Sequence, residues 1–229
     1  MASAKLAKQQ LRSIVKARLA ELPQEAITSQ SRRIFDTLQD YRLYRDANRI
    51  SIYLSMPAAE VQTDALVRHA LQAGKQVFVP YLHKSTLTTP DTPTRVMEMV
   101  RLNSIQDYES LLPDKWGIPS IDAATVAERE CILGNDTATL DLMLVPGVAF
   151  DLDQQGSVRR LGHGKGFYDF FLNRYFERQG TKEGGLKTIG LGLQQQLLDP
   201  LAGESVPMGQ YDRVLHGVIL GDGSIKESK

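Results

Sequence analysis

The amino-acid sequence predicts an α/β fold, with helices on both faces of a mainly parallel central sheet in a three-layer, Rossmann-like arrangement. Over the first 80 residues, segments with helical periodicity alternate with short strand-like segments, which is the rhythm of a parallel sheet covered by helices. Residues 141–145 (DLMLV) then form an apolar strand that ends at Pro146-Gly147, as a central strand buried on both faces does. We therefore expect one domain over residues 1–229.

The first predicted element is a helix over residues 3–22. Its apolar residues recur at helical spacing and define one face, which comprises Leu11, Ile14, Val15, Leu19 and Leu22. The same segment is basic apart from Glu21 and is amphipathic, so a mitochondrial presequence is the alternative. We favour the structural helix and expect a cytoplasmic protein, with a mitochondrial location as the second reading.

The later elements follow from the same kinds of signal. In the first half we expect a helix at 29–43, a strand at 49–54, a helix from Thr63 to Gly74, and strands at 76–80 and 95–102. Residues 83–94 contain repeated Thr-Pro steps, which predicts a loop. In the second half we expect an irregular wall at 111–121, a polar turn at 151–159, a helix at 167–178, a loop at 179–187, strands at 188–193 and 214–220, and a flexible tail at 222–229.

The composition of the chain argues against nucleic-acid-binding and membrane-spanning proteins. The chain has 27 Lys plus Arg and 27 Asp plus Glu residues, hence no net charge, whereas a nucleic-acid binder usually has a basic excess. No apolar run reaches the roughly 18 residues that a membrane span needs. The single cysteine, Cys131, excludes an internal disulfide and fits a reducing compartment. We expect a monomer that acts on small molecules, with no nucleic-acid or membrane partner.

The sequence RLGHGKGFYD at residues 160–169 carries the clearest functional signal. Because glycine has no Cβ, backbone N–H groups around Gly162, Gly164 and Gly166 can converge on one anion. Lys165 adds an ammonium group, and Asp169 is well placed to hold a divalent cation on phosphates. The segment predicts a nucleotide-phosphate loop that leads into a helix, although it lacks the Walker A pattern. A Gly-rich turn with no ligand is the alternative.

Three loops are expected at the carboxyl ends of the predicted strands, where ligands bind in open α/β sheets. They span residues 56–63, 116–119 and 146–169. The first contains the acidic Glu60, the second offers the flat surface of Trp116, and the third contains the glycine-rich segment. Their side chains are chemically complementary, which favours a shared ligand site.

Two blocks of sequence resemble the signature of the 5-formyltetrahydrofolate cyclo-ligase family, also called methenyltetrahydrofolate synthetases. These blocks are VPGVAFD at 145–151 and RLGHGKGFYD at 160–169. Weaker similarities occur in the family's order at KQQLR (8–12), LSM (54–56), EVQT (60–63) and GLGL (190–193) with Gln196. The resemblance spans nearly the whole chain.

This resemblance implies a magnesium-dependent ligase that uses ATP to close 5-formyltetrahydrofolate to 5,10-methenyltetrahydrofolate, releasing ADP and phosphate through a phosphorylated formyl group. By resemblance, Lys165, Arg160 and Tyr168 are catalytic. The implied nucleotide contacts are Lys8, Arg12, Arg160, Leu161, Gly162, His163, Gly164, Lys165, Gly166, Phe167 and Tyr168.

The resemblance also implies the folate contacts. Leu54 and Glu60 match positions that contact the folate, and Glu60 can accept hydrogen bonds from N–H groups of the pterin ring. Trp116 and Tyr168 are expected to flank the folate or its reacting end, with Tyr81 as a weaker candidate. Without the resemblance, Glu60 would be interpreted as an exposed loop acid and Trp116 as a core residue.

The resemblance also implies metal contacts, and the sequence differs from the family pattern at two positions of the site. Asp169 is the expected Mg²⁺ ligand, and the second acidic contact is either Glu204 or Asp212. His163 stands where relatives often have arginine or tyrosine, and Phe167 replaces the first tyrosine of a common pair. Because histidine has an unperturbed pKa of about 6.5, we expect a modest pH dependence of ATP affinity.

Two other functions fit part of the sequence. Sugar-phosphate isomerases and CoA transferases share this kind of architecture, so the fold alone assigns no activity. A non-catalytic folate-binding protein is the second alternative. It would have no need of Lys165 and Asp169, which argues against it.

Overall fold

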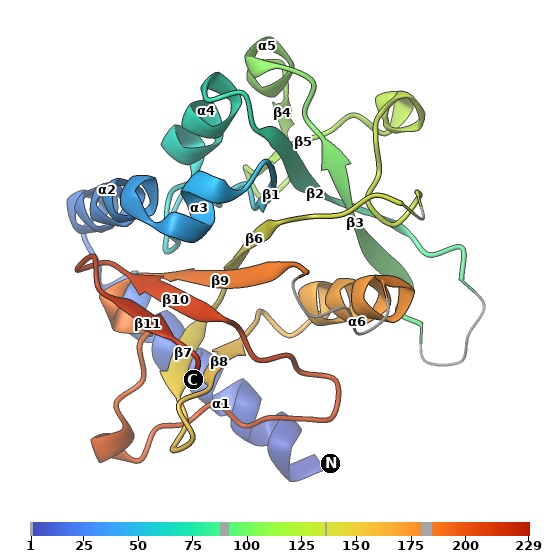
Figure 1. Ribbon diagram of the computed structural model, residues 1–229. Coiled ribbons are helices and arrows are strands. Elements are labelled where there is room, and N and C mark those ends of the chain that lie inside the picture. Colours follow the sequence, from blue (N-terminus) through green and yellow to red (C-terminus); the bar gives the residue numbers. More distant parts are fainter. Residues whose placement is uncertain (1, 88–91, 136, 180–184) are drawn as a thin grey trace.

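A twisted sheet runs through the centre of the protein (Figure 1). The computed structural model describes residues 2–87, 92–135, 137–179 and 185–229. Within them, the strands of this sheet are β1 (Arg49–Ile52), β2 (Gln76–Lys84), β3 (Arg95–Arg101), β6 (Leu142–Pro146), β9 (Lys187–Gly192), β10 (Gly217–Leu220) and β11 (Ile225–Glu227). Their order is β11-β10-β9-β6-β1-β2-β3.

The five inner strands are parallel to one another, and the two edge strands are antiparallel to their neighbours. β6 is the middle strand, and each of its residues is buried, as its apolar sequence predicted. Helices lie on both faces of the sheet (Figure 1), so the predicted three-layer α/β architecture is confirmed. The carboxyl ends of the inner strands share one edge of the sheet.

Successive side chains along the strands point to opposite faces of the sheet, and each face has its own hydrophobic core. Ile50 and Ile52 of β1 and Leu144 of β6 belong to one cluster, whereas Met143 and Val145 of β6 belong to the other. This is the period of two that a pleated strand imposes. Both faces of the sheet are therefore covered.

The helices supply the outer layers. They are α1 (Ala2–Ala20), α2 (Gln24–Asp40), α3 (Arg42–Asp46), α4 (Asp64–Gln72), α5 (Ile105–Glu109) and α6 (Phe167–Gln179), with 3₁₀ turns η1 (Ala123–Glu128), η2 (Gln194–Gln196) and η3 (Pro200–Ala202). Buried residues of α2 and α4 join the first cluster, and those of α6 join the second. Among the described residues, no helix is long and apolar enough to cross a membrane.

The helix expected at 29–43 begins earlier and is interrupted. Pro23, at the N-cap position, is followed directly by α2, and Tyr41 adopts an extended backbone that separates α2 from α3. The helix after Thr63 forms as expected and is followed by Gly74 in a left-handed conformation (φ 75°). The hydroxyl group of Thr63 does not cap this helix, because it donates to the carbonyl oxygen of Tyr53 at 2.7 Å.

Besides a short ladder in the segment 111–121, two strand-forming regions were not expected from the sequence. Residues 151–159, expected as a polar turn, belong to a hairpin of β7 (Ala149–Leu152) and β8 (Val158–Leu161). The tail expected to be flexible contains β11, which pairs with β10. Both regions have polar sequences, which do not show the pattern of a strand. In the hairpin, the polar Asp151 and Arg159 pair with each other. β11 lies at the edge of the sheet and pairs only with β10.

Smaller corrections concern the loops. β2 continues to Lys84, past the expected start of the loop, because it pairs with β3 along its whole length. The irregular wall at 111–121 contains a short ladder of β4 (Leu112–Pro113) with β5 (Pro119–Ser120). Residues 88–91 and 180–184 of the two expected loops lie outside the described residues.

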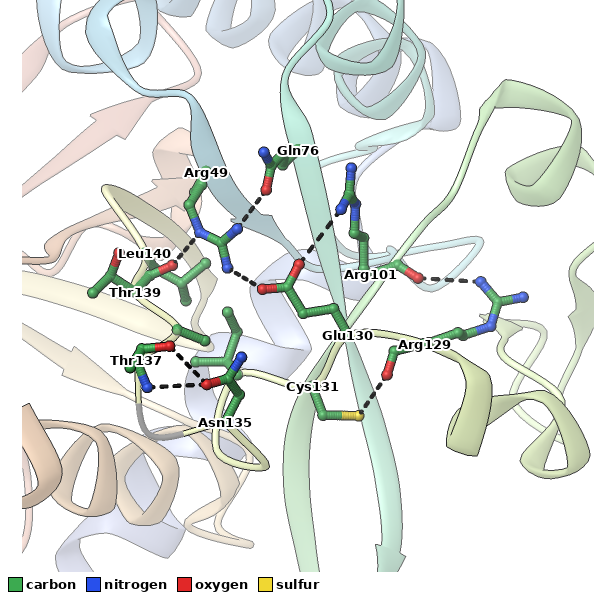
Figure 2. Close-up of polar contacts among 12 residues, drawn as sticks. Arg49, Gln76, Arg101, Arg129, Glu130, Cys131, Asn135, Thr137, Thr139 and Leu140 are labelled. Carbon is green, nitrogen blue, oxygen red and sulfur yellow. Dashed lines mark hydrogen bonds and ion pairs between the residues drawn. The ribbon is translucent and has the colours of Figure 1, made fainter.

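An ionic network closes the opposite edge of the sheet, where β1 begins (Figure 2). The guanidinium group of Arg49 donates to the Thr139 carbonyl oxygen at 2.6 Å and to the Glu130 carboxylate at 2.7 Å. Glu130 also pairs with Arg101 at 3.5 Å. Cys131 lies beside Val100 of β3, and burial raises the pKa of its thiol, which disfavours the nucleophilic thiolate.

Helix α1 is part of the fold. Leu11, Val15 and Leu19 from its predicted apolar face are buried in the first core cluster, whereas Ile14 is exposed. In Figure 1, α1 lies beside the β7–β8 hairpin. This burial supports the structural-helix reading and places the basic face of α1 next to the glycine-rich loop.

Candidate active site

The glycine-rich loop connects β8 to α6 and has the backbone that its sequence predicts. Gly164 and Gly166 have φ values of 94° and 68°, a region that residues with a Cβ rarely adopt. The carbonyl oxygen of Gly166 accepts the N–H of Phe170 at 2.9 Å and so begins the helical ladder. The loop therefore presents backbone N–H groups and the amino end of α6, which together favour an anion.

Helix α1 brings two cations to this loop. The Nε of Arg12 donates to the carbonyl oxygen of Gly162 at 2.7 Å, and a Cβ on Gly164 would lie 3.2 Å from the Arg12 guanidinium carbon. Lys8 pairs with Asp212 in the late loop. The side chain of Lys165 is exposed. Residues about 150 positions apart thus form one basic surface around the loop.

Arg160 is the buried cation of the site. It is 7% exposed, donates to an oxygen of Asp169 at 2.7 Å, and donates to the Pro146 carbonyl at 3.2 Å. Its guanidinium also lies over the Tyr168 ring, 5.5 Å from the centroid. Within the described part of the chain, its buried Nε has no hydrogen-bond partner. A buried unpaired donor is costly, so an acceptor from a ligand is favoured here.

Glu60 lies close to His163 of the glycine-rich loop and is buried. Its position in a loop would by itself predict an exposed side chain. It is 6% exposed and accepts the N–H of Met56 at 2.9 Å. Burial raises the pKa of Glu60 to about 7, against the lowering effect of that hydrogen bond. Burial also raises the pKa values of Tyr53 and Tyr168, and the nearby Glu60 adds to both shifts. Glu60 is therefore a buried carboxyl group close to the phenol groups of Tyr53 and Tyr168.

The other two residues expected to contact the folate are Leu54 and Trp116. Leu54 follows β1 and is buried. Trp116 is 65% exposed, and its ring lies 5.4 Å from the Lys115 ammonium group. Its neighbour Gly117 approaches Pro57 so closely that a Cβ would lie 2.9 Å from the proline ring. The loop of Trp116 therefore adjoins the loop of Glu60, but the structure shows Trp116 at the rim and not in the core.

Two side chains of the predicted nucleotide segment pack against the cores of the protein. The Leu161 side chain is 1% exposed and packs in the core, while its carbonyl oxygen accepts the N–H of Val148 at 2.7 Å. Phe167 is half-buried and packs against the second core cluster. Any nucleotide contact from Leu161 must come from its backbone.

The carboxylates available for a metal ion are dispersed. Asp169 accepts from Arg160 and from the Arg213 N–H at 3.2 Å. Asp212, next to Arg213, pairs with Lys8, whereas Glu204 pairs with Arg18. Among the described residues, no three His, Cys, Asp or Glu side chains converge. This donor set fits Mg²⁺, which takes one or two carboxylates and completes its shell with phosphate oxygens and water.

Sequence reasoning did not select three groups that organise the site. Asp151 pairs with Arg159 across the hairpin at 2.6 Å and also accepts the Val206 N–H at 2.7 Å. Arg213 reaches Asp169 through its backbone. Gln196 donates to the Gly147 carbonyl and accepts the Leu193 N–H at 2.7 Å. Gln196 was noted only as part of a motif, and backbone contacts such as that of Arg213 leave no signal in the sequence.

Comparisons with known proteins agree along almost the whole chain. The model of the 5-formyltetrahydrofolate cyclo-ligase family matches residues 4–221. A protein named probable 5-formyltetrahydrofolate cyclo-ligase in Caenorhabditis elegans is 30% identical over 96% of this chain and 95% of its own. A mouse protein named 5-formyltetrahydrofolate cyclo-ligase is 31% identical over 94% of each chain.

The fold is also similar to that of solved structures. The NMR structure of 5,10-methenyltetrahydrofolate synthetase from Aquifex aeolicus superposes with a TM-score of 0.65 at 22% identity and covers 96% of this chain and 92% of its own. A synthetase structure from Mycoplasma pneumoniae gives a TM-score of 0.58 at 17% identity, covering 93% and 97%. At these identities the similarity supports the architecture alone.

Proposed function

This chain belongs to the 5-formyltetrahydrofolate cyclo-ligase family, and we propose that it uses ATP to convert 5-formyltetrahydrofolate to 5,10-methenyltetrahydrofolate. The formyl oxygen is a poor leaving group. Transfer of the terminal phosphoryl group of ATP to that oxygen forms a new P–O bond and releases ADP. Attack of folate N10 on the activated carbon then closes the ring, and the oxygen leaves within inorganic phosphate.

The basic surface around the glycine-rich loop supplies the phosphate contacts in this proposal. Arg12 is partly exposed and Lys165 is exposed, so a ligand at the loop can reach both side chains. Lys8 lies one turn before Arg12 in the same helix. Arg160 adds a buried guanidinium whose Nε has no acceptor among the residues that the structure describes. Phosphoryl transfer asks a protein mainly for alignment and charge neutralisation, and these cations supply both.

We assign Mg²⁺ to Asp169, with Asp212 as the second acidic contact. Asp212 is adjacent to Arg213, whose N–H contacts Asp169, and its partner Lys8 belongs to the basic surface at the loop, whereas Glu204 pairs with Arg18. The ion would neutralise charge on the phosphate oxygens. Arg160 holds the Asp169 carboxylate in place for this role.

The surroundings of Glu60 are proposed to hold the pterin ring. A carboxylate accepts hydrogen bonds from ring N–H groups, and the burial of Tyr53 and Tyr168 near it limits contact with water. Exclusion of water is useful here, because water would hydrolyse the activated formyl group. The exposed Trp116 is proposed to cover the folate, and the buried Leu54 to contact its inner side.

The observation that carries the proposal is the contact between the two halves of the site. His163 of the phosphate loop lies 3.9 Å from Glu60, so nucleotide and folate would meet at one loop. The test follows methenyltetrahydrofolate absorbance with purified protein, 5-formyltetrahydrofolate, Mg²⁺ and ATP, omitting one component at a time. We expect product only with all four. Tight folate binding without product or ADP would overturn the proposal in favour of a folate-binding protein.

A further inference from the structure

His163 occupies the contact between the two halves of the site. Its loop neighbours Gly162 and Gly164 touch Arg12 of α1, while its own Nε2 lies 3.9 Å from an oxygen of Glu60. The His163 side chain is 42% exposed and that of Glu60 is 8% exposed. One histidine therefore stands between the basic phosphate surface and a buried carboxyl group.

The charges around His163 disfavour its protonation in the free protein. Burial and the cations Lys16, Arg160 and Arg12, in that order, lower the pKa of His163 below its ordinary value. Burial raises the pKa of Glu60 to about 7. Near neutral pH, His163 is thus largely uncharged and Glu60 is partly protonated, so the ion pair that their separation permits is mostly unformed.

We propose that His163 couples nucleotide binding to folate binding by switching on an ion pair with Glu60. An ATP phosphate chain on the loop compensates the charges of Arg12, Arg160 and Lys16 that oppose protonation of His163. The imidazolium then stabilises the Glu60 carboxylate, which is the form that accepts hydrogen bonds from pterin N–H groups. This inference rests on the proposed function and assigns His163 as a positioning residue within it.

The proton balance of the switch closes without a co-reactant. Nε2 of His163 gains one proton and Glu60 loses the fraction of a proton that it still holds, so the pair takes up the remainder of that proton from solvent. Because His163 is partly exposed, solvent can carry the proton and no direct transfer is required. The charge created at Glu60 is compensated within the same contact.

The test measures the Kd of 5-formyltetrahydrofolate at pH 6.5 with and without Mg²⁺ and β,γ-imido-ATP. In the wild type, the analogue should tighten folate binding up to about fourfold, because a carboxyl group with a pKa of about 7 is only about one-quarter ionised at that pH. His163→Gln should bind folate weakly under both conditions, because an amide carries no charge. His163→Arg should bind folate tightly without the analogue, because its charge is permanent. In both variants the effect of the analogue should fall to near onefold.

A second measurement reads the switch directly. NMR titration of the His163 imidazole, assigned by its absence in His163→Gln, should show a higher pKa with the analogue bound. His216→Gln is the matched control, because His216 is exposed at the amino end of β10 and bonds to Thr188. It should keep the wild-type coupling.

The outcomes separate this inference from the proposed function. If His163→Gln keeps the wild-type coupling, or the imidazole titrates equally with and without the analogue, the switch is wrong even when the wild type closes the folate ring. If the wild type binds neither ligand, the proposed function fails first, and the switch fails with it.

Discussion

At the scale of single residues, Lys165 combines an exposed side chain with a central place in the glycine-rich loop. It contributes nothing to the core, so its removal tests chemistry and not folding. We expect Lys165→Ala to lower kcat by about 100-fold or more, the loss typical when one charge-stabilising donor is removed from a transition state. Its melting temperature should match that of the wild type.

The matched change is Lys226→Ala on β11, at the far edge of the sheet. It should leave kcat unchanged. Turnover of Lys165→Ala within a few-fold of the wild-type value would remove this lysine from the mechanism.

Glu60 offers a prediction about stability that is independent of ligands. Its pKa is about 7 in the folded protein and 4.5 as an ordinary side chain. The unfolded chain therefore loses this proton first as pH rises, so the buried carboxylate costs stability that grows between pH 4.5 and about 7 and is then constant. With about 1.4 kcal/mol per pKa unit, the cost above pH 7 is about 3 kcal/mol.

Glu60→Gln removes the charge and keeps an oxygen for the Met56 N–H. We expect the variant to be more stable than the wild type at pH 8 and about equally stable at pH 4.5, as measured by urea denaturation at both values. At the same time it should weaken folate binding much more than ATP binding. If the variant and the wild type were equally stable at pH 8, Glu60 would not be a costly buried charge. If the variant lost as much affinity for ATP as for folate, Glu60 would not be a specific folate contact.

At the scale of elements, β11 is the feature on which sequence and structure disagree most. β11 pairs with β10 in antiparallel register, and the hydroxyl group of Ser228 accepts the Val158 N–H at 2.8 Å. We expect removal of residues 222–229 to destabilise the protein by about 2 kcal/mol or more, because several hydrogen bonds worth about 0.5–1.5 kcal/mol each are lost. The bared edge of β10 should also promote aggregation.

A chain that ends at Ser228 keeps the whole of β11 and is the control. Thermal unfolding and light scattering distinguish the two truncations. Unchanged stability after removal of residues 222–229 would restore the interpretation of this segment as a flexible tail.

Elements with strong local patterns could be predicted from the sequence. β6, α6 and β9 appear within one or two residues of their expected bounds, because apolar runs and helical periodicity are local properties. The β7–β8 hairpin could not, because its polar residues are buried by pairing with each other. Asp151 and Arg159 look like turn residues until the strands that carry them lie side by side.

The residues proposed for the site were selected mainly through the resemblance of short motifs, and their geometry could not be predicted. Nothing local in the sequence shows that Arg12 contacts Gly162 or that Lys8 pairs with Asp212, since these partners are 150 and 204 positions apart. Burial of Glu60 is likewise a product of tertiary packing. The sequence shows which chemical groups are present, and the fold decides which of them meet.

At the scale of the whole molecule, the candidate site joins α1, the β7–β8 hairpin, α6 and the late loop, so ligands should stabilise the entire fold. A ligand at 100 times its Kd adds about 2.7 kcal/mol to the free energy of unfolding. For a domain of this size we expect saturating Mg²⁺ and ATP to raise Tm by about 5–10 °C. The measurement is thermal unfolding with ATP, with and without EDTA.

Asp169→Asn isolates the metal-dependent part of that stabilisation. Asparagine keeps oxygen and size but removes the charge that is proposed to hold Mg²⁺ and that pairs with Arg160, so the free variant should melt lower than the wild type. Its Tm with ATP should be the same whether Mg²⁺ or EDTA is present, whereas the wild type and the surface control Asp36→Asn should melt higher with Mg²⁺. If Asp169→Asn retains the wild-type difference between Mg²⁺ and EDTA, the ion is held by other groups, and Asp169 serves only to orient Arg160.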